Sequence, residues 1–461
     1  MNEEAIASAY ELLRGSVMTY GGAPVGTVAA VAADDAEAEN YHDCFVRDFI
    51  PSALVFLADG ETDIVRNFLL TVLRLRSQHQ RIHGHQIEPA VLPASFRVGL
   101  DAQGQERVRA DFGDHAIGRV APVDAMMWWV ILLNIYCRAT GDKALALEPE
   151  VQRALRGVLD LTLREGFEVF PTLLVPDGAF MIDRRMGVYG HPLEIQSLFY
   201  GMLVSAVELL RDTPESHAVL MLAETRAKML RNYVQLFYWL DVERLNEIHR
   251  YRTEEFGTGS VNMLNIYPES IPEWVVDWLP ARAGFLVGNL GPGRMDFRFF
   301  ALGNLLAIIF GITSQREAQG IMRLYQDRWE DLVGNMPAKL VYPAVVGKEW
   351  MFMTGSDPKN VPWSYHNGGN WPVLIWAFVA AAMKTGRGDL AQLALDVADH
   401  GLPQANFPEY YDGRAGNLIG RRAHLRQVWS AAGYILGHKI VENDRLLDMF
   451  CAVDQREQED A

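Results

Sequence analysis

The chain has 461 residues, of which 49% are hydrophobic and 22% are charged, and its formal net charge is −16. This composition supports a large apolar core and excludes a disordered protein. The negative charge repels nucleic acids and anionic lipids over long range. Apolar stretches such as residues 126–136 are too short to cross a bilayer. We therefore expect a globular protein that has neither nucleic acid nor a membrane as its partner.

Three scattered cysteines, Cys44, Cys137 and Cys451, have no paired spacing. An odd number of isolated thiols suits a reducing compartment better than a disulfide framework. The first residues lack the positive region and apolar core of a secretory signal. The sequence thus predicts a cytoplasmic protein.

Two kinds of helical stretch alternate along the chain. Amphipathic stretches cover residues 3–20, 62–78, 143–164, 218–240, 314–332 and 389–400. Nearly apolar stretches, typical of helices buried on all sides, cover residues 49–58, 125–138, 193–210, 299–312, 372–383 and 428–437. The alternation predicts an all-α fold in which six inner helices are wrapped by six outer ones, an (α/α)6 barrel, as a single domain over residues 1–461.

Two connections, at about residues 79–118 and 241–295, are longer than ordinary loops and are predicted to be insertions. The second contains Trp274 and Trp278. These side chains either pack on the rim of the barrel or form a subunit contact, so a homo-oligomer is one of two alternatives.

Polar, glycine-rich segments precede the apolar helices, so we expect them to converge on one end of the barrel. Two of them carry the carboxylates Asp183 and Glu409. An isolated carboxylate is more often a surface group or a helix cap. Two carboxylates delivered by loops into one pocket, however, are the minimum equipment of a glycoside hydrolase.

Charged and aromatic residues in the same segments suit sugar binding. Arg47 with Asp48, and Arg119 with Asp124, are either structural ion pairs or groups that bind vicinal hydroxyls, in which case the arginine keeps the aspartate ionised. Trp371 follows Gly368 and Gly369 and is predicted to stack on a sugar ring.

Other sites have weaker support. His79, His83 and His85 have a spacing that suits a metal, but no acidic or cysteine partner is fixed nearby. The glycine-rich residues 288–293 lack the strand and lysine of a phosphate loop. We therefore expect no metal and no cofactor.

Several runs resemble the neutral and alkaline invertases, glycoside hydrolase family one hundred. The matching runs extend from about residue 40 to about 435, and they include residues 45–49, 110–113, 117–124, 182–187, 189–196, 365–372 and 407–413. The resemblance implies an (α/α)6 barrel that hydrolyses sucrose in the cytosol without metal or cofactor. It places the catalytic acid at Asp183 and its partner carboxylate at Glu409.

The resemblance also implies a set of substrate-binding residues, and a looser likeness to trehalases supports Arg119, Asn367 and Gln427 among them. The full set that we expect to contact sucrose is Arg47, Asp48, Arg119, Asp124, His191, Gln196, His366, Asn367, Trp371, Tyr410 and Gln427. Glucose is expected inside the pocket, and fructose toward Trp371 and the 241–295 connection.

The predicted reaction is an inverting hydrolysis in which Asp183 protonates the bridging oxygen and Glu409 activates water. A general acid must stay protonated near neutral pH. We therefore expect Arg184 and Arg185 to turn toward other carboxylates or backbone carbonyls. The alternatives are a trehalase-like or other α-glucosidase on the same barrel, and a catalytically silent sugar-binding protein.

Overall fold

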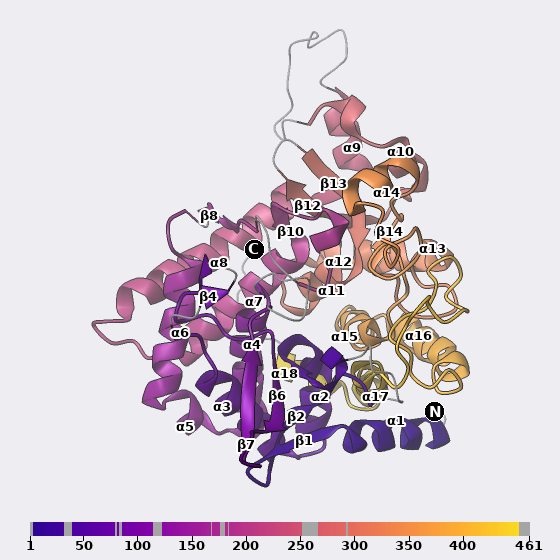
Figure 1. Ribbon diagram of the computed structural model, residues 1–461. Coiled ribbons are helices and arrows are strands. Elements are labelled where there is room, and N and C mark those ends of the chain that lie inside the picture. Colours follow the sequence, from indigo (N-terminus) through magenta and orange to yellow (C-terminus); the bar gives the residue numbers. More distant parts are fainter. Residues whose placement is uncertain are drawn as a thin grey trace.

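The computed structural model describes residues 3–31, 39–78, 81–82, 85–113, 122–166, 168–175, 180–182, 184–250, 266–291 and 294–450. Helices dominate, as Figure 1 shows, and short strands lie in several places around them.

The apolar stretches form the helices at the centre. They are α2 (Val46–Ala58), α4 (Ala125–Thr140), α7 (Leu193–Leu209), α11 (Ala301–Ile309), α15 (Ile375–Lys384) and α17 (Val428–Glu442). Each packs against the next, and α17 packs back on α2, so the six helices contact one another in a closed cycle. Neighbours on several sides explain why these sequences are apolar around the whole helix.

The amphipathic stretches form helices that cover this cycle. They are α1 (Glu3–Gly15), α3 (Thr62–Arg74), α5 (Lys143–Ala146), α6 (Pro149–Thr162), α8 (His217–Phe237), α12 (Gln315–Asp327), α13 (Trp329–Leu332) and α16 (Gly388–Gly401). Helix α8 packs on α7, α16 on α15 and α17, and α1 on α17. The predicted alternation of exposed and buried helices is confirmed, although two predicted outer helices are each broken into a pair.

The all-α class needs correction, because the described residues also contain β-sheets. The largest joins β10 (His191–Pro192), β11 (Trp239–Asp241), β12 (Gly284–Gly291), β13 (Arg294–Phe300) and β14 (Val341–Tyr342). A second joins β3 (Cys44–Phe45), β6 (Ser95–Leu100) and β7 (Glu106–Asp111). Two-stranded sheets pair β1 (Val17–Tyr20) with β2 (Ala23–Thr27), β4 (Arg81–Ile82) with β5 (His85–Gln86), and β8 (Glu168–Val169) with β9 (Thr172–Leu173).

The strands fix the entrances of the central helices. Strand β3 runs directly into α2, β10 into α7 and β13 into α11. The hairpin β6–β7 and strand β12 come from the two long connections, so each connection supplies the partner that holds such an entrance in place. Pairing of this kind fixes the backbone at the helix starts, where the candidate site residues lie.

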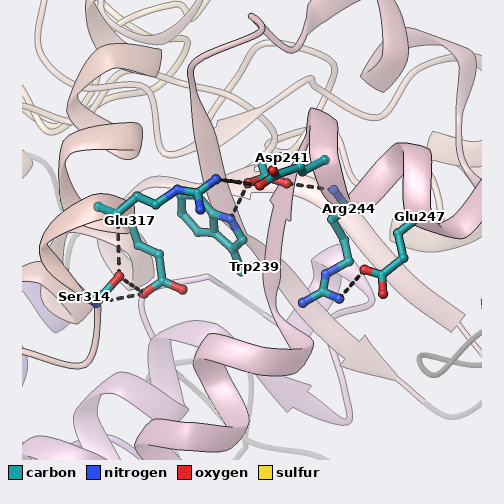
Figure 2. Close-up of polar contacts among 8 residues, drawn as sticks. Trp239, Asp241, Arg244, Glu247, Ser314 and Glu317 are labelled. Carbon is teal, nitrogen blue, oxygen red and sulfur yellow. Dashed lines mark hydrogen bonds and ion pairs between the residues drawn. The ribbon is translucent and has the colours of Figure 1, made fainter. Parts of the chain in front are cut away.

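The second connection also contributes α9 (Val242–Arg250) and α10 (Glu273–Trp278), which lie with β12, β13 and α14 (Gly347–Thr354) at the top of Figure 1. Polar contacts anchor its start (Figure 2). Asp241 accepts hydrogen bonds from the Trp239 indole and the Arg244 backbone, at 2.9 and 2.8 Å. Nearby, Ser314 and Glu317 form a capping box at the start of α12.

Trp278 does not form an exposed surface. It is 6% exposed, its indole donates to Asp331 Oδ2 at 2.8 Å, and its ring stacks on Tyr342 at 4.8 Å. Trp274 meets Trp278 edge to face. Rim packing therefore explains Trp278, whereas Trp274 is partly exposed. Among the described helices, which end with α18 (Leu447–Phe450), none is long and apolar enough to cross a membrane.

Candidate active site

The described candidate residues lie at the starts of the central helices and in the loops before them. Asp48 is in the first turn of α2, Asp124 caps α4, and Gln427 precedes α17. Asp183 and Arg119 lie outside the described residues, as do His79 and His83. The site is therefore built here from the groups around Glu409 and Arg47.

Glu409 is buried, with 4% of its surface exposed. The Tyr41 hydroxyl donates to Glu409 Oε1 at 3.0 Å, and Lys359 Nζ lies 3.9 Å from Oε2. Oε2 itself has no hydrogen-bond partner within the described part of the chain. Burial, together with the charge of Glu409, raises the pKa of Tyr41, so this phenol stays a hydrogen-bond donor.

The backbone before Glu409 is unusual. Asn406 and Phe407 have positive φ angles of 60° and 49°, which are rare for a bulky residue such as phenylalanine. Both carbonyls accept hydrogen bonds from the entrance of α17, from the N–H groups of Arg426 and Gln427 at 2.8 and 2.9 Å. The carboxylate is thus carried on a bend that the neighbouring helix entrance holds in place.

Arg47 links the two aspartates that sequence analysis paired with arginines. Its Nη1 lies 2.8 Å from Asp124 Oδ2, and its Nε lies 3.8 Å from Asp48 Oδ1. Arg47 therefore pairs more closely with Asp124 than with its sequence neighbour.

The expectation that arginine keeps the aspartate ionised is not met for Asp48, although Arg47 itself lowers the pKa of this carboxyl. Burial raises the pKa of Asp48 to about 7, because desolvation and the charges of Glu409 and Asp124 outweigh the attraction of Arg47. Burial likewise raises the pKa of Asp124. One guanidinium shared between carboxylates in a buried setting does not compensate for their loss of water.

Glu194 belongs to the same cluster and was missed. It is 1% exposed, and burial raises its pKa to about 8, with Asp124 adding to the shift. Its Oε1 accepts a hydrogen bond from the Met181 N–H at 2.9 Å, two residues before Asp183. A single acid in the otherwise apolar first turn of α7 was the signal, since glutamate is almost never fully buried without a reason.

Electrostatic contacts join these residues into one site. The charges of Glu409 and Asp124 both raise the pKa of Asp48. The charge of Asp124 raises the pKa of Glu194, and that of Arg47 lowers it. The structure thus brings together residues from α2, α4, α7 and the loop before α17.

Two residues that were predicted to bind sugar form hydrogen bonds with backbone groups instead, which corrects their assignment. Gln196 is fully buried, and its amide exchanges two 2.9 Å hydrogen bonds with the N–H and carbonyl of Leu173. Asn367 is also fully buried; it accepts from the Val345 N–H at 2.7 Å and donates to the Val345 and Asn360 carbonyls. These amides position loops around the site.

The aromatic candidates pack against one another. Trp371 is 1% exposed, stacks on Tyr410 at 5.5 Å and lies 5.1 Å from the His366 ring. Tyr410 is fully buried, and its hydroxyl donates to the Arg421 carbonyl at 2.6 Å. His366 stacks on Tyr365 at 4.0 Å. This packing corrects the prediction that Trp371 stacks on a sugar. The rings of Trp371 and Tyr410 instead support the loops that carry the site.

His191 and Gln427 remain predicted ligands. His191 is half-buried, burial lowers its pKa, and its Nδ1 has no hydrogen-bond partner among the described residues. Gln427 is 1% exposed, and its backbone N–H is tied to Phe407.

Arg185 forms an ion pair with a carboxylate other than Asp183. Its Nη1 lies 3.1 Å from Asp357 Oδ2. The positive charge of Arg185 is thereby partly neutralised two residues after Asp183. The Arg184 side chain lies outside the described set.

Comparisons with known proteins identify the family of the chain. The family model for alkaline and neutral invertases matches residues 9–444. The chain belongs to this family. It is 47% identical to alkaline/neutral invertase C, mitochondrial, of Arabidopsis thaliana over 95% of the chain and 67% of that protein. It is 47% identical to cytosolic invertase 1 of Oryza sativa subsp. japonica over 96% of the chain and 79% of that protein. The invertase activity predicted from the sequence is thus confirmed at the level of the family.

Solved structures resemble the chain in fold alone. A bacterial glucoamylase complexed with acarbose has a TM-score of 0.58 at 12% identity, over 97% of this chain and 56% of that one. A wild-type glycosidase has a TM-score of 0.55 at 14% identity, over 96% and 99%. A mannosylglycerate hydrolase from Thermus thermophilus in complex with glucose has a TM-score of 0.53 at 14% identity, over 94% and 99%.

Proposed function

We propose that this invertase hydrolyses sucrose by inversion, with Asp183 as general acid and Glu409 as general base. The observation that carries the proposal is the setting of Glu409. It is a buried carboxylate with a cation beside it, held on a strained loop and electrostatically coupled to Asp48. Strained backbone and perturbed carboxyls gather at functional sites.

The two carboxyl groups have different tasks. An inverting enzyme needs an acid that is protonated and a base that is ionised, about 6.5 to 9.5 Å apart, so that water fits between the base and the sugar. Glu194, which binds the Met181 N–H, supports the loop that leads to Asp183. Arg185 pairs with Asp357, which offsets part of its positive charge.

The inner subsite is proposed to hold glucose. Arg47, Asp48 and Asp124 offer donors and acceptors for a pyranose that is gripped on several sides. Fructose is placed toward the 241–295 connection. A cavity of about 970 Å³, lined by Trp274, Arg298 and Trp363 among others, opens on that side.

The closed cycle of α2, α4, α7, α11, α15 and α17 with its outer helices supports an (α/α)6 barrel, which we propose as a single catalytic domain over residues 1–461 with insertions at about 79–118 and 241–295. We also propose a cytoplasmic enzyme. Cytosolic invertase 1 of rice is a relative, and other relatives carry mitochondrial or chloroplastic names. Formation of a homo-oligomer stays a prediction, which light scattering would test.

Purified protein tests the substrate directly, by sugar release from sucrose, trehalose, maltose and raffinose. We expect release from sucrose. Activity on trehalose but not on sucrose would instead support a trehalase-like enzyme, and no turnover on any sugar would support a silent sugar-binding protein.

Proton NMR of the anomeric signals in the first minutes tests the stereochemistry. Inversion at the glucosyl carbon releases β-glucose first. Initial α-glucose would show attack on the fructosyl carbon, or retention, and would contradict the proposed orientation or mechanism.

A further inference from the structure

A short loop, residues 357–360, contacts both Arg185 and Glu409. Asp357 pairs with Arg185, and its side chain is 9% exposed. It also accepts hydrogen bonds from the Lys359 N–H and the Asn360 amide, both at 2.9 Å. Asp357 therefore fixes the backbone from which Lys359 projects.

Lys359, in the same loop, contacts Glu409. Its Nζ lies 3.9 Å from Glu409 Oε2 and 3.8 Å from the centre of the Tyr365 ring, and its side chain is 24% exposed. Sequence analysis did not identify this lysine, because no spacing links residue 359 to residue 409. The ring of Tyr365 below it favours the charged ammonium in this position.

Other groups also lie near Glu409. The Tyr41 hydroxyl donates to Oε1, and the Tyr41 ring packs against the His424 ring at 3.8 Å. The backbone N–H of Glu409 donates to the His424 carbonyl. Asp48 adds negative charge. Among ion pairs between described residues, Glu409 has a single partner, Lys359.

A general base must be ionised before it can take a proton from water. A cation about 4 Å from a carboxylate favours its ionised form. A separation of 3.9 Å is too long for a hydrogen bond. Lys359 therefore acts through its charge and leaves Oε2 free to accept a hydrogen bond from the attacking water.

We propose that Lys359 is a positioning residue of this reaction: its ammonium keeps Glu409 ionised while leaving Oε2 available to water. The inference rests on the proposed role of Glu409 as general base. It adds a residue from a third loop, which is held in place through Asp357.

The test compares the pH dependence of kcat on sucrose in wild type, Lys359→Met and Lys359→Arg. We expect the acidic limb of the Lys359→Met profile to move up by about one pH unit or more. The loss in kcat should be about tenfold or greater on that limb and should shrink as the pH rises, because Glu409 ionises without help at higher pH. KM should change less than kcat, and Lys359→Arg should restore most of the wild-type profile.

Lys348→Met, which removes an exposed lysine at the start of α14, is the matched control and should keep the wild-type profile. Thermal unfolding of each variant separates misfolding from chemistry, and Lys359→Arg keeps the test informative if Lys359→Met unfolds. An acidic limb at its wild-type position in folded Lys359→Met, or a loss that is the same at every pH, would overturn the inference.

Glu409→Gln in the same assay separates this inference from the proposed function. If Glu409→Gln keeps more than about a tenth of the wild-type rate, the role of Glu409 is wrong. If Glu409→Gln is inactive and Lys359→Met keeps the wild-type limb, only the inference about Lys359 fails.

Discussion

The two halves of the site surround their carboxyl groups with different partners. At the entrances of α2, α4 and α7, Asp48, Asp124 and Glu194 are buried near the Arg47 guanidinium, and burial raises all three pKa values. At the loop before α17, Glu409 has a lysine and a tyrosine hydroxyl beside it. Residue type alone therefore does not assign a role; the number of cations and donors around each carboxyl group does.

Removing the reactive carboxyls should give the largest effect. For Asp183→Asn and Glu409→Gln we expect kcat to fall by about 10² to 10⁴-fold with sucrose binding largely kept, because each change removes proton transfer but little volume. Single-turnover kinetics and calorimetric binding measure the two quantities. Asp444→Asn, at an exposed position of the surface, is the control. A rate above about a tenth of wild type would contradict the assigned role.

The second-largest effect is expected when the close packing of the loop that carries Glu409 is disturbed. A Cβ at Gly413 would overlap the Gly368 carbonyl oxygen, so Gly413→Ala must push two loops apart. We expect a loss of about 1 to 3 kcal/mol in the free energy of unfolding, and a lower kcat. Denaturant unfolding and sucrose assays check this.

Gly15→Ala is the matched control, because a Cβ there meets nothing within 4 Å. Its stability and activity should stay close to wild type. A Gly413→Ala protein that matches Gly15→Ala in both would show that the two loops are not in contact in solution.

Glu194→Gln sharpens the comparison with a smaller effect. The pKa of Glu194 is raised from 4.5 to about 8, so its burial costs nothing below about pH 4.5 and destabilises the fold progressively as the pH rises to about 8. The glutamine mimics the protonated acid and does not titrate. We therefore expect the variant to gain stability over wild type across this window, by at most about 1.4 kcal/mol per pH unit.

Thermal unfolding at pH 5 and pH 8 measures this gain, and activity near pH 6 should stay within a few-fold of wild type. An equal difference in Tm at both pH values would show that Glu194 does not titrate in this window.

The helices could be predicted because their polarity reflects their surroundings. The apolar stretch 193–210 became α7 (Leu193–Leu209), and the amphipathic stretch 62–78 became α3 (Thr62–Arg74). The strands could not, because most are short, and those that hold the entrances of α2 and α7 pair with distant segments. For example, β10 has two residues, and its partner β12 lies about a hundred residues later.

Site prediction was limited by the ambiguity of side-chain chemistry. The amide of Asn367 can bind a sugar hydroxyl or a backbone group, and only the folded chain shows that Val345 and Asn360 occupy it. Lys359 was missed because its proposed role depends on a contact with Glu409 that only the folded chain creates. Family motifs located the carboxylates and said little about the groups that tune them.

The closure of the helical cycle has a consequence for biosynthesis. Helix α17, near the end of the described chain, packs on α2 and on α1, near its beginning. During translation the apolar sides of α1 and α2 lack this partner until residues 428–442 have left the ribosome. Contacts between such distant segments slow folding, and exposed apolar helices attract chaperones or aggregate. A nascent chain that stalls before α17 should therefore be a chaperone substrate rather than a folded fragment.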